Sequence, residues 1–268
     1  MKPRFQISAF SQFSRGSTRI FTLAFVLVFC FFVLCLSFFI PSAFMLLEAK
    51  EKFPCEDLQR LQKIALGLEF GEPLKKLMLW EQDIFIRIKG SPTAEDLQVL
   101  QAVVNELNQL QQKIKLTLQP GSEPSEQDNL EIIFAPYRRF QFLDPYYIAH
   151  NKGFFSVEQE DDRLYSARIL ISTNKISQAE RNHLIREELT QSLGLFNDTR
   201  DQPESIFEAR WTQVQKYSEQ DRRLIQLLYS GALFAGQPAE QIERAFCSHY
   251  FSLRCFLPQG PCQKNHEN

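Results

Sequence analysis

The first hydrophobic feature of the chain is a long apolar run that no polar position interrupts for more than one residue. The run "IFTLAFVLVFCFFVLCLSFFI", residues 20–40, contains 21 residues and no charge. A helix of about 20 apolar residues crosses the core of a bilayer. The run therefore predicts a transmembrane anchor within residues 20–46, after a short segment 1–19.

Basic residues precede the apolar run, and the first 46 residues contain no acidic residue. This asymmetry places the N-terminus in the cytoplasm and exports everything that follows the anchor. The alternative is a signal peptide that is cleaved to release a secreted protein. The apolar core of a signal peptide usually has about 7–15 residues, so the longer run favours the uncleaved anchor.

A helical pattern follows the anchor over residues 47–79, and it is broken by Gly71 and Pro73. The helix is either a stalk or a helix packed on the domain. Its apolar positions recur at helical spacing, and they are Leu58, Leu61, Ile64 and Leu68.

From residue 80 to 246 the pattern alternates between strands and helices. Four strands are predicted, at "DIFIRIKG", "KLTLQP", "NLEIIFAP" and "YSARILIST". A long helix joins the first two, with Ser91 as its N-cap and Pro92 at its first position. Residues 137–165 are irregular and aromatic, and we expect either a binding rim or a hairpin that packs its aromatic side chains on the core.

A second helix is predicted at "SQAERNHLIREELTQSLGLFND", with Ser177 as its cap and Glu180 in the capping-box position. Its apolar residues, among them Leu189, should form one buried face, with Glu187 roughly opposite. Ser218 caps a further helix. The order of elements predicts an α+β (α/β-like) fold, a mixed sheet backed by two helices.

Charge and cysteine content narrow the class of protein. The formal net charge is −2, the first 46 residues carry +4, and the exported part is acidic without a basic cluster, which argues against nucleic-acid binding. In an oxidising compartment the four cysteines outside the apolar run predict two disulfides, with three pairings open. These cysteines are Cys55 and three in a tail of residues 247–268, namely Cys247, Cys255 and Cys262.

The stretch "EELTQSLGLFND", residues 187–198, resembles the active-site helix of metzincin proteases. In that resemblance Glu187 and Gln191 occupy the positions of the two histidine ligands, and Glu188 occupies that of the general base. Gly194 matches the turning glycine and Asn197 the third ligand, with Asp198 next to it. The segment "SIFEARW" resembles the turn beneath the metal, with Phe207 in place of methionine. The resemblance implies a zincin-like domain over residues 80–246.

The chain resembles more closely a bacterial family of unknown function, number 2927, whose exported members carry an EELxQxLGLxND signature. The resemblance implies the bacterial inner membrane, with the N-terminus in the cytoplasm and the domain in the periplasm. The signature residues would be Glu187, Glu188, Gln191, Gly194, Asn197 and Asp198.

The residues in the ligand positions do not favour zinc, because they supply only oxygen atoms and two of them are neutral amides. No cofactor is therefore expected. The alternative is zinc or calcium held by Glu187, Gln191, Asn197, Asp198 and His183. His183 is otherwise expected to face solvent or to form a local hydrogen bond. Glu188 is the candidate catalytic base, or else it accepts hydrogen bonds from neighbouring backbone or from an arginine such as Arg186 or Arg210.

Three hypotheses of function remain open. The first is a non-proteolytic binding protein of the cell envelope, anchored in the membrane through residues 20–46, that holds an envelope protein or peptide beside the signature helix. The second is a metal-dependent hydrolase that uses Glu188 as its base. The third is a structural scaffold in which the signature serves only the fold.

Overall fold

The computed structural model describes residues 53–67, 72–119, 124–200 and 202–244, all within one compact unit. The predicted anchor at 20–46 and the cysteine tail at 247–268 lie outside this part, as does the side chain of Cys55. Over the described ranges, none of the helices has both the length and the apolar character needed to cross a bilayer.

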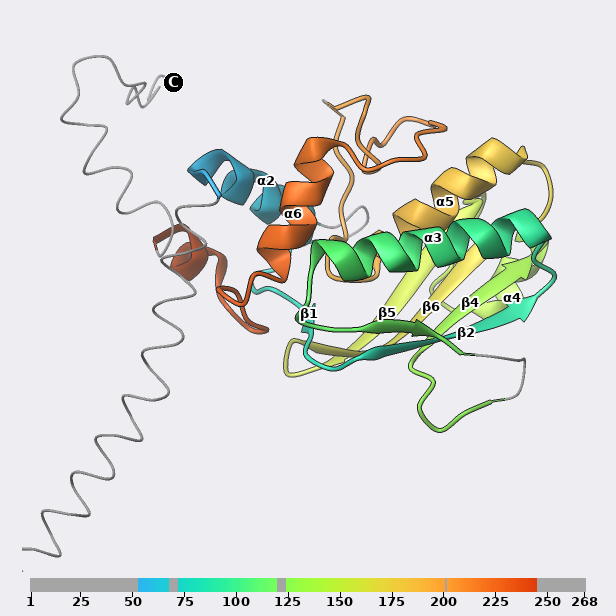
Figure 1. Cartoon of the computed structure of the whole chain (residues 1–268), viewed down its shortest axis with the longest axis horizontal. Helices are drawn as coiled ribbons and strands as arrows, with labels where there is room; N and C mark the ends of the chain where they lie inside the picture. Colours follow the sequence, from blue (N-terminus) through green and yellow to red (C-terminus); the bar gives the residue numbers. More distant parts are fainter. Residues whose placement is uncertain (1–52, 68–71, 120–123, 201, 245–268) are drawn as a thin grey trace, which may run out of the picture. The chain divides into compact units, whose positions relative to one another are not determined.

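A six-stranded mixed sheet forms the centre of the unit (Figure 1). Four strands lie parallel in the order β3-β2-β4-β6, β1 pairs in parallel with the start of β6, and β5 runs antiparallel along β6. Their bounds are β1 Leu79–Trp80, β2 Ile84–Gly90, β3 Leu116–Leu118, β4 Leu130–Ala135, β5 Gly153–Glu160 and β6 Arg163–Ser172. The mixed sheet predicted from the sequence is confirmed.

The β5–β6 hairpin resolves the irregular region between residues 137 and 165. A two-residue turn joins the strands, and Asp161 and Asp162 both have positive φ, 50° and 64°. Aspartate tolerates this backbone conformation, which matches the twist of a tight hairpin. Of the two expectations for this region, the hairpin is therefore present, and β5 is a strand that the hydrophobic pattern alone did not predict.

Two long helices cover one face of the sheet (Figure 1). They are α3 Ala94–Leu110 and α5 Gln178–Gln191. Ser177 caps α5 and Ser218 caps α6 Glu219–Leu228, as predicted. The predicted cap of α3 is wrong: Thr93 accepts from the Asp96 backbone N–H and forms a capping box, two residues later than Ser91.

The predicted helix over residues 47–79 is shorter in the structure. Helix α2 spans Cys55–Ala65, and the chain later enters β1. Leu58, Leu61 and Ile64 are fully buried in the main core, where α2 packs against α6. Helix α2 thus belongs to the domain.

The opposite face of the sheet carries a smaller apolar cluster built by the segment after β4. This segment forms a single turn of 3-10 helix, η1 Tyr137–Arg139, and the short helix α4 Phe140–Leu143. Buried Phe140 meets Tyr147 edge to face, and Tyr147 meets Phe154 in the same way, with ring centroids 5.3 and 5.6 Å apart. This contact fixes the loop against β5.

Candidate functional site

Helix α5 is buried on every side from Arg181 to Gln191. The prediction of one buried face with Glu187 pointing outward is therefore wrong. The reason lies in the tertiary structure. Helix α3 and the sheet cover two sides of α5, and on a further side Val214, Gln215 and Tyr217, in the segment after α5, bind side chains of the helix. His183 is likewise buried, because its Nδ1 lies 2.6 Å from the Val214 carbonyl oxygen of that segment.

The end of α5 is held by backbone geometry and by two buried side chains. Gly194 has φ of +118°, and a Cβ there would lie 2.6 Å from the Met78 carbonyl oxygen, so only glycine fits. The Trp80 indole donates to the Ser192 carbonyl and the Tyr229 hydroxyl to the Leu193 carbonyl, at 2.9 and 2.7 Å. These bonds satisfy carbonyls that a helix end leaves without partners.

A cavity of about 720 Å³ lies between α5 and the edge strand β5. Its walls combine residues of β5, of the loop before it, of α5 and of the segment after α5. The polar lining residues from the signature region are His183, Glu187, Glu188, Gln191 and Asp198. Side chains that the sequence placed on different faces of one helix thus border one space.

His183 and Glu187 form a pair one helical turn apart in this lining. His183 Nε2 lies 3.2 Å from a carboxylate oxygen of Glu187. Burial lowers the pKa of His183, but the hydrogen bond and charge of Glu187, helped by the Val214 carbonyl and the Asp198 charge, outweigh burial and raise the pKa above its usual value. The pair therefore favours a protonated imidazole beside the cavity.

Gln191 and Asp198 form the second pair, in which the amide of Gln191 donates to Asp198 Oδ1 at 2.7 Å. Asn197 forms its hydrogen bonds with α2 instead. Its amide donates to the Lys63 carbonyl at 3.1 Å, and its backbone N–H donates to Ile64. Asn197, a candidate metal ligand in the sequence, therefore holds the end of α2 and does not line the cavity.

Glu188 lies against Gly153, the first residue of β5. A Cβ on Gly153 would lie 2.2 Å from Glu188 Oε1, so the missing side chain of Gly153 leaves room for the carboxylate. The expected arginine partners are engaged elsewhere: Arg186 binds Glu106 at 2.6 Å, and Arg210 binds Glu208 at 2.7 Å. The candidate base thus borders the cavity beside the backbone of the edge strand.

The segment predicted to resemble a methionine turn passes along the cavity. Phe207 is fully buried, while Glu208, Arg210 and Trp211 line the space. Trp211 is 59% exposed, and its indole donates to Glu180 at 2.6 Å. The sequence named Arg210 only as a partner of Glu188, and it did not select Glu208 or Trp211. A tryptophan in a largely polar segment is the signal that could have identified this wall, since aromatic residues are enriched in binding surfaces.

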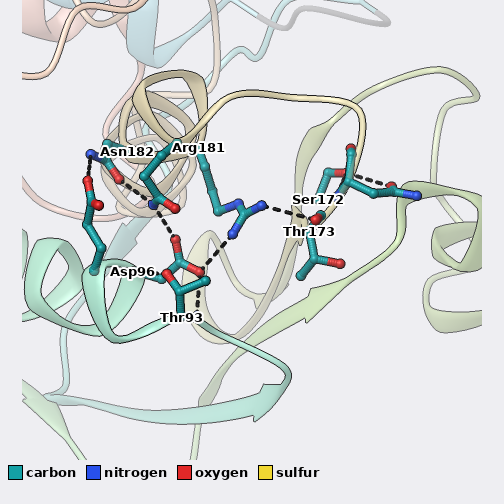
Figure 2. A network of polar contacts seen from close by, with 9 residues as sticks. Thr93, Asp96, Ser172, Thr173, Arg181 and Asn182 are labelled. Atoms are coloured by element: carbon teal, nitrogen blue, oxygen red, sulfur yellow. Dashed lines mark hydrogen bonds and ion pairs between the residues drawn. The ribbon is translucent and has the colours of Figure 1, made fainter.

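The other end of α5 holds a polar network whose residues are not among those lining this cavity (Figure 2). Buried Arg181 forms an ion pair with Asp96 at 3.2 Å and donates to the Thr173 carbonyl at 3.0 Å. Gln178 donates to the other oxygen of Asp96 at 2.7 Å. These bonds tie the starts of α3 and α5 to the end of β6.

Comparison with known proteins identifies the family of the chain but gives no activity for it. No curated protein is significantly similar to the chain. Over the described ranges, the structure contains no group of three or more histidine, cysteine, aspartate or glutamate side chains arranged to hold a metal ion. The model of the family "Protein of unknown function (DUF2927)" matches residues 58–247, well over half of the 268 residues, and the chain belongs to this family.

Proposed function

We propose that this chain is a membrane-anchored, exported protein of the cell envelope that binds a peptide segment in the cavity between α5 and β5 without cleaving it. The proposal rests on the observation that the cavity lies along β5, an edge strand of the sheet. Over the described ranges, β5 pairs only with β6. An extended peptide can add to such an edge through backbone hydrogen bonds.

The hydrogen-bond register of the hairpin indicates which groups a peptide would meet. The backbone N–H of Ser172 donates to the Lys152 carbonyl at 2.8 Å. Bonded and non-bonded pairs alternate in an antiparallel ladder, so the N–H and C=O groups of Phe155 and Val157 point away from β6. Phe155 also stacks on Phe196, at a centroid distance of 6.0 Å, which gives the cavity an aromatic wall.

The arrangement also supports a zincin-like interpretation of the fold, with an antiparallel edge strand beside the helix that carries the signature. The contacts at the ligand positions do not fit the zinc site of that class. Glu187 is engaged by His183, Gln191 by Asp198, and Asn197 by the end of α2. Both ring nitrogens of His183 already have partners. These contacts support binding without metal-assisted hydrolysis.

The proposal is tested with the detergent-solubilised full chain and a phage-displayed library of random peptides. We expect selected peptides to slow amide exchange at Phe155 and Val157 and to remain intact in mass spectra. Val157→Pro removes an outward N–H without removing a bond to β6, and it should abolish binding. The matched control Val157→Thr keeps the N–H and should bind.

Three results would contradict the proposal. Failure to select any peptide above background, or full binding by Val157→Pro, would exclude the addition of a peptide to the edge of β5. Cleaved peptides, together with stoichiometric metal that is lost in Glu187→Ala and Gln191→Ala, would instead establish the hydrolase. Glu188→Gln should keep the fold and weaken peptide binding, and unchanged binding with this variant would exclude Glu188 from the site.

A further inference from the structure

Four basic side chains gather at one end of the sheet, where β4 and β6 finish and β5 begins. They are Arg138, Arg139, Lys152 and Lys175, and we call this group the basic tip. The tip is assembled by contacts between its loops. The Tyr137 backbone N–H donates to the Asn174 side chain at 3.3 Å, and the Lys152 ammonium lies over the Tyr137 ring.

The charges of the basic tip are not neutralised by neighbouring carboxylates. Within the part of the chain that the structure describes, none of its four residues forms an ion pair. Asp144, an acidic residue nearby, is buried, and its carboxylate accepts from Ser156 at 2.5 Å. A hydrogen bond from Arg138, with the charges of Lys152 and Lys175, lowers the pKa of Tyr137. A concentrated positive patch thus stands on a chain whose net charge is −2.

Two large aromatic side chains lie exposed in the same segment as the two arginines. Phe142 is 80% exposed and Tyr146 is 74% exposed. Phe142 belongs to α4, and the fully buried side chain of Phe140 anchors this helix to the domain. Aromatic side chains beside basic ones are characteristic of protein surfaces that lie at the boundary between lipid headgroups and acyl chains.

We propose that the basic tip binds the surface of an anionic bilayer, with Phe142 and Tyr146 entering the headgroup region and the four cations contacting lipid phosphates. The exposed side chain of Phe142 has no hydrogen-bonding group, so its transfer from water into the bilayer is the more favourable of the two. Each basic residue near an anionic surface strengthens binding by about fivefold. Tyr146 and Lys152 also line the cavity, so docking is measured without a peptide.

A flat lipid surface accounts for the observations better than a single bound phosphate or a nucleic acid. Arg138, Arg139 and Lys175 are exposed and are not among the residues that line the cavity beside α5. A nucleic acid would account for the cations, but it does not need an apolar side chain as exposed as Phe142 next to them. Both of these ligands are nevertheless included as outcomes of the test.

The test uses the full chain in bilayer nanodiscs made of phosphatidylcholine alone or mixed with phosphatidylglycerol. Hydrogen–deuterium exchange of residues 137–147 reports docking. We expect slower exchange in the anionic nanodiscs only, and loss of the effect at high salt. Arg138→Gln with Arg139→Gln should weaken docking about 25-fold and remove the protection, and Phe142→Ser should weaken it as well.

The matched control is Lys113→Gln with Lys115→Gln, which removes the same charge from exposed positions before β3, at the opposite end of the sheet. This control should dock like the unmodified chain. Equal exchange in the two lipids, or equal loss in the control pair, would overturn the proposal. Protection in detergent by inorganic phosphate, or by a DNA oligonucleotide, would replace the bilayer with a soluble anion or a nucleic acid.

Discussion

The two ends of α5 both bury polar side chains, but they connect them differently. At the start of the helix, Arg181 and Gln178 bind Asp96, a residue 85 and 82 positions away in the chain. Towards its end, His183 binds Glu187 within the helix, and Gln191 binds Asp198 only 7 positions away. The first set fastens separate elements together, while the second orients neighbouring groups along the wall of a cavity.

This difference indicates which polar residues serve the fold and which can serve a ligand. A buried charge bound by distant elements stabilises the fold only while all of its partners remain, because an unpaired buried charge is costly. A pair formed within one segment can change its contacts without separating two elements, although His183 also contacts the Val214 carbonyl, 31 positions away. We therefore expect substitutions at the first end to affect stability, and substitutions at the cavity to affect binding more than stability.

The largest effect on stability is expected from Asp96→Ala. This change leaves Arg181 buried without its carboxylate and removes the capping box of α3. The free energy of unfolding should fall by about 3–5 kcal/mol, as measured by denaturant titration. The double variant Asp96→Leu with Arg181→Met is the control, and it should recover much of the loss. A small effect of Asp96→Ala would mean that the network does not hold the helices.

A smaller effect is expected from Gly153→Ala, on the cavity side. The new Cβ would lie 2.2 Å from Glu188 Oε1 and 2.8 Å from Leu184 Cδ2, so the carboxylate must move. We expect a loss of about 1–3 kcal/mol in the free energy of unfolding, with loss of peptide binding in the library assay. Unchanged binding in a folded Gly153→Ala chain would contradict the position assigned to Glu188.

The His183–Glu187 pair should give a pH-dependent difference between the unmodified chain and Glu187→Gln. The folded pKa of His183 is raised, so its contribution is fully present below the unfolded pKa of about 6.5 and is lost as the pH rises through the folded pKa. Glutamine still accepts a hydrogen bond, so the difference should be about 1 kcal/mol at low pH. Unfolding titrations across this range measure it, and a difference that grew with pH would contradict the assignment.

The smallest effect on stability is expected from Trp211→Ala, at the mouth of the cavity. Trp211 is largely exposed and gives up one hydrogen bond to Glu180. The free energy of unfolding should change by less than about 0.5 kcal/mol, while peptide binding should weaken. Phe234→Ala, at a similarly exposed aromatic residue outside the cavity lining, serves as the control and should leave both quantities unchanged.

Local signals in the sequence were sufficient for much of the fold. Alternation of apolar residues identified β2, β3, β4 and β6 but not the two-residue strand β1, and the serine caps identified α5 and α6, because both signals depend on the nearest few residues. Strand β5 was not predicted as a strand. As an edge strand it buries little on either face, and its residues show only a weak alternation.

The sequence by itself determined the family, through the signature at residues 187–198, and it marked Glu188 and its neighbours as the candidate site. The tertiary structure alone decided which side chains meet. It buried His183 and Glu187 and set His183 against the Val214 carbonyl, turned Asn197 to α2, and brought Arg138, Lys152 and Lys175 to one tip. The physical reason is that helical periodicity describes one helix against one surface, whereas α5 is covered by packing partners that lie far away in the chain.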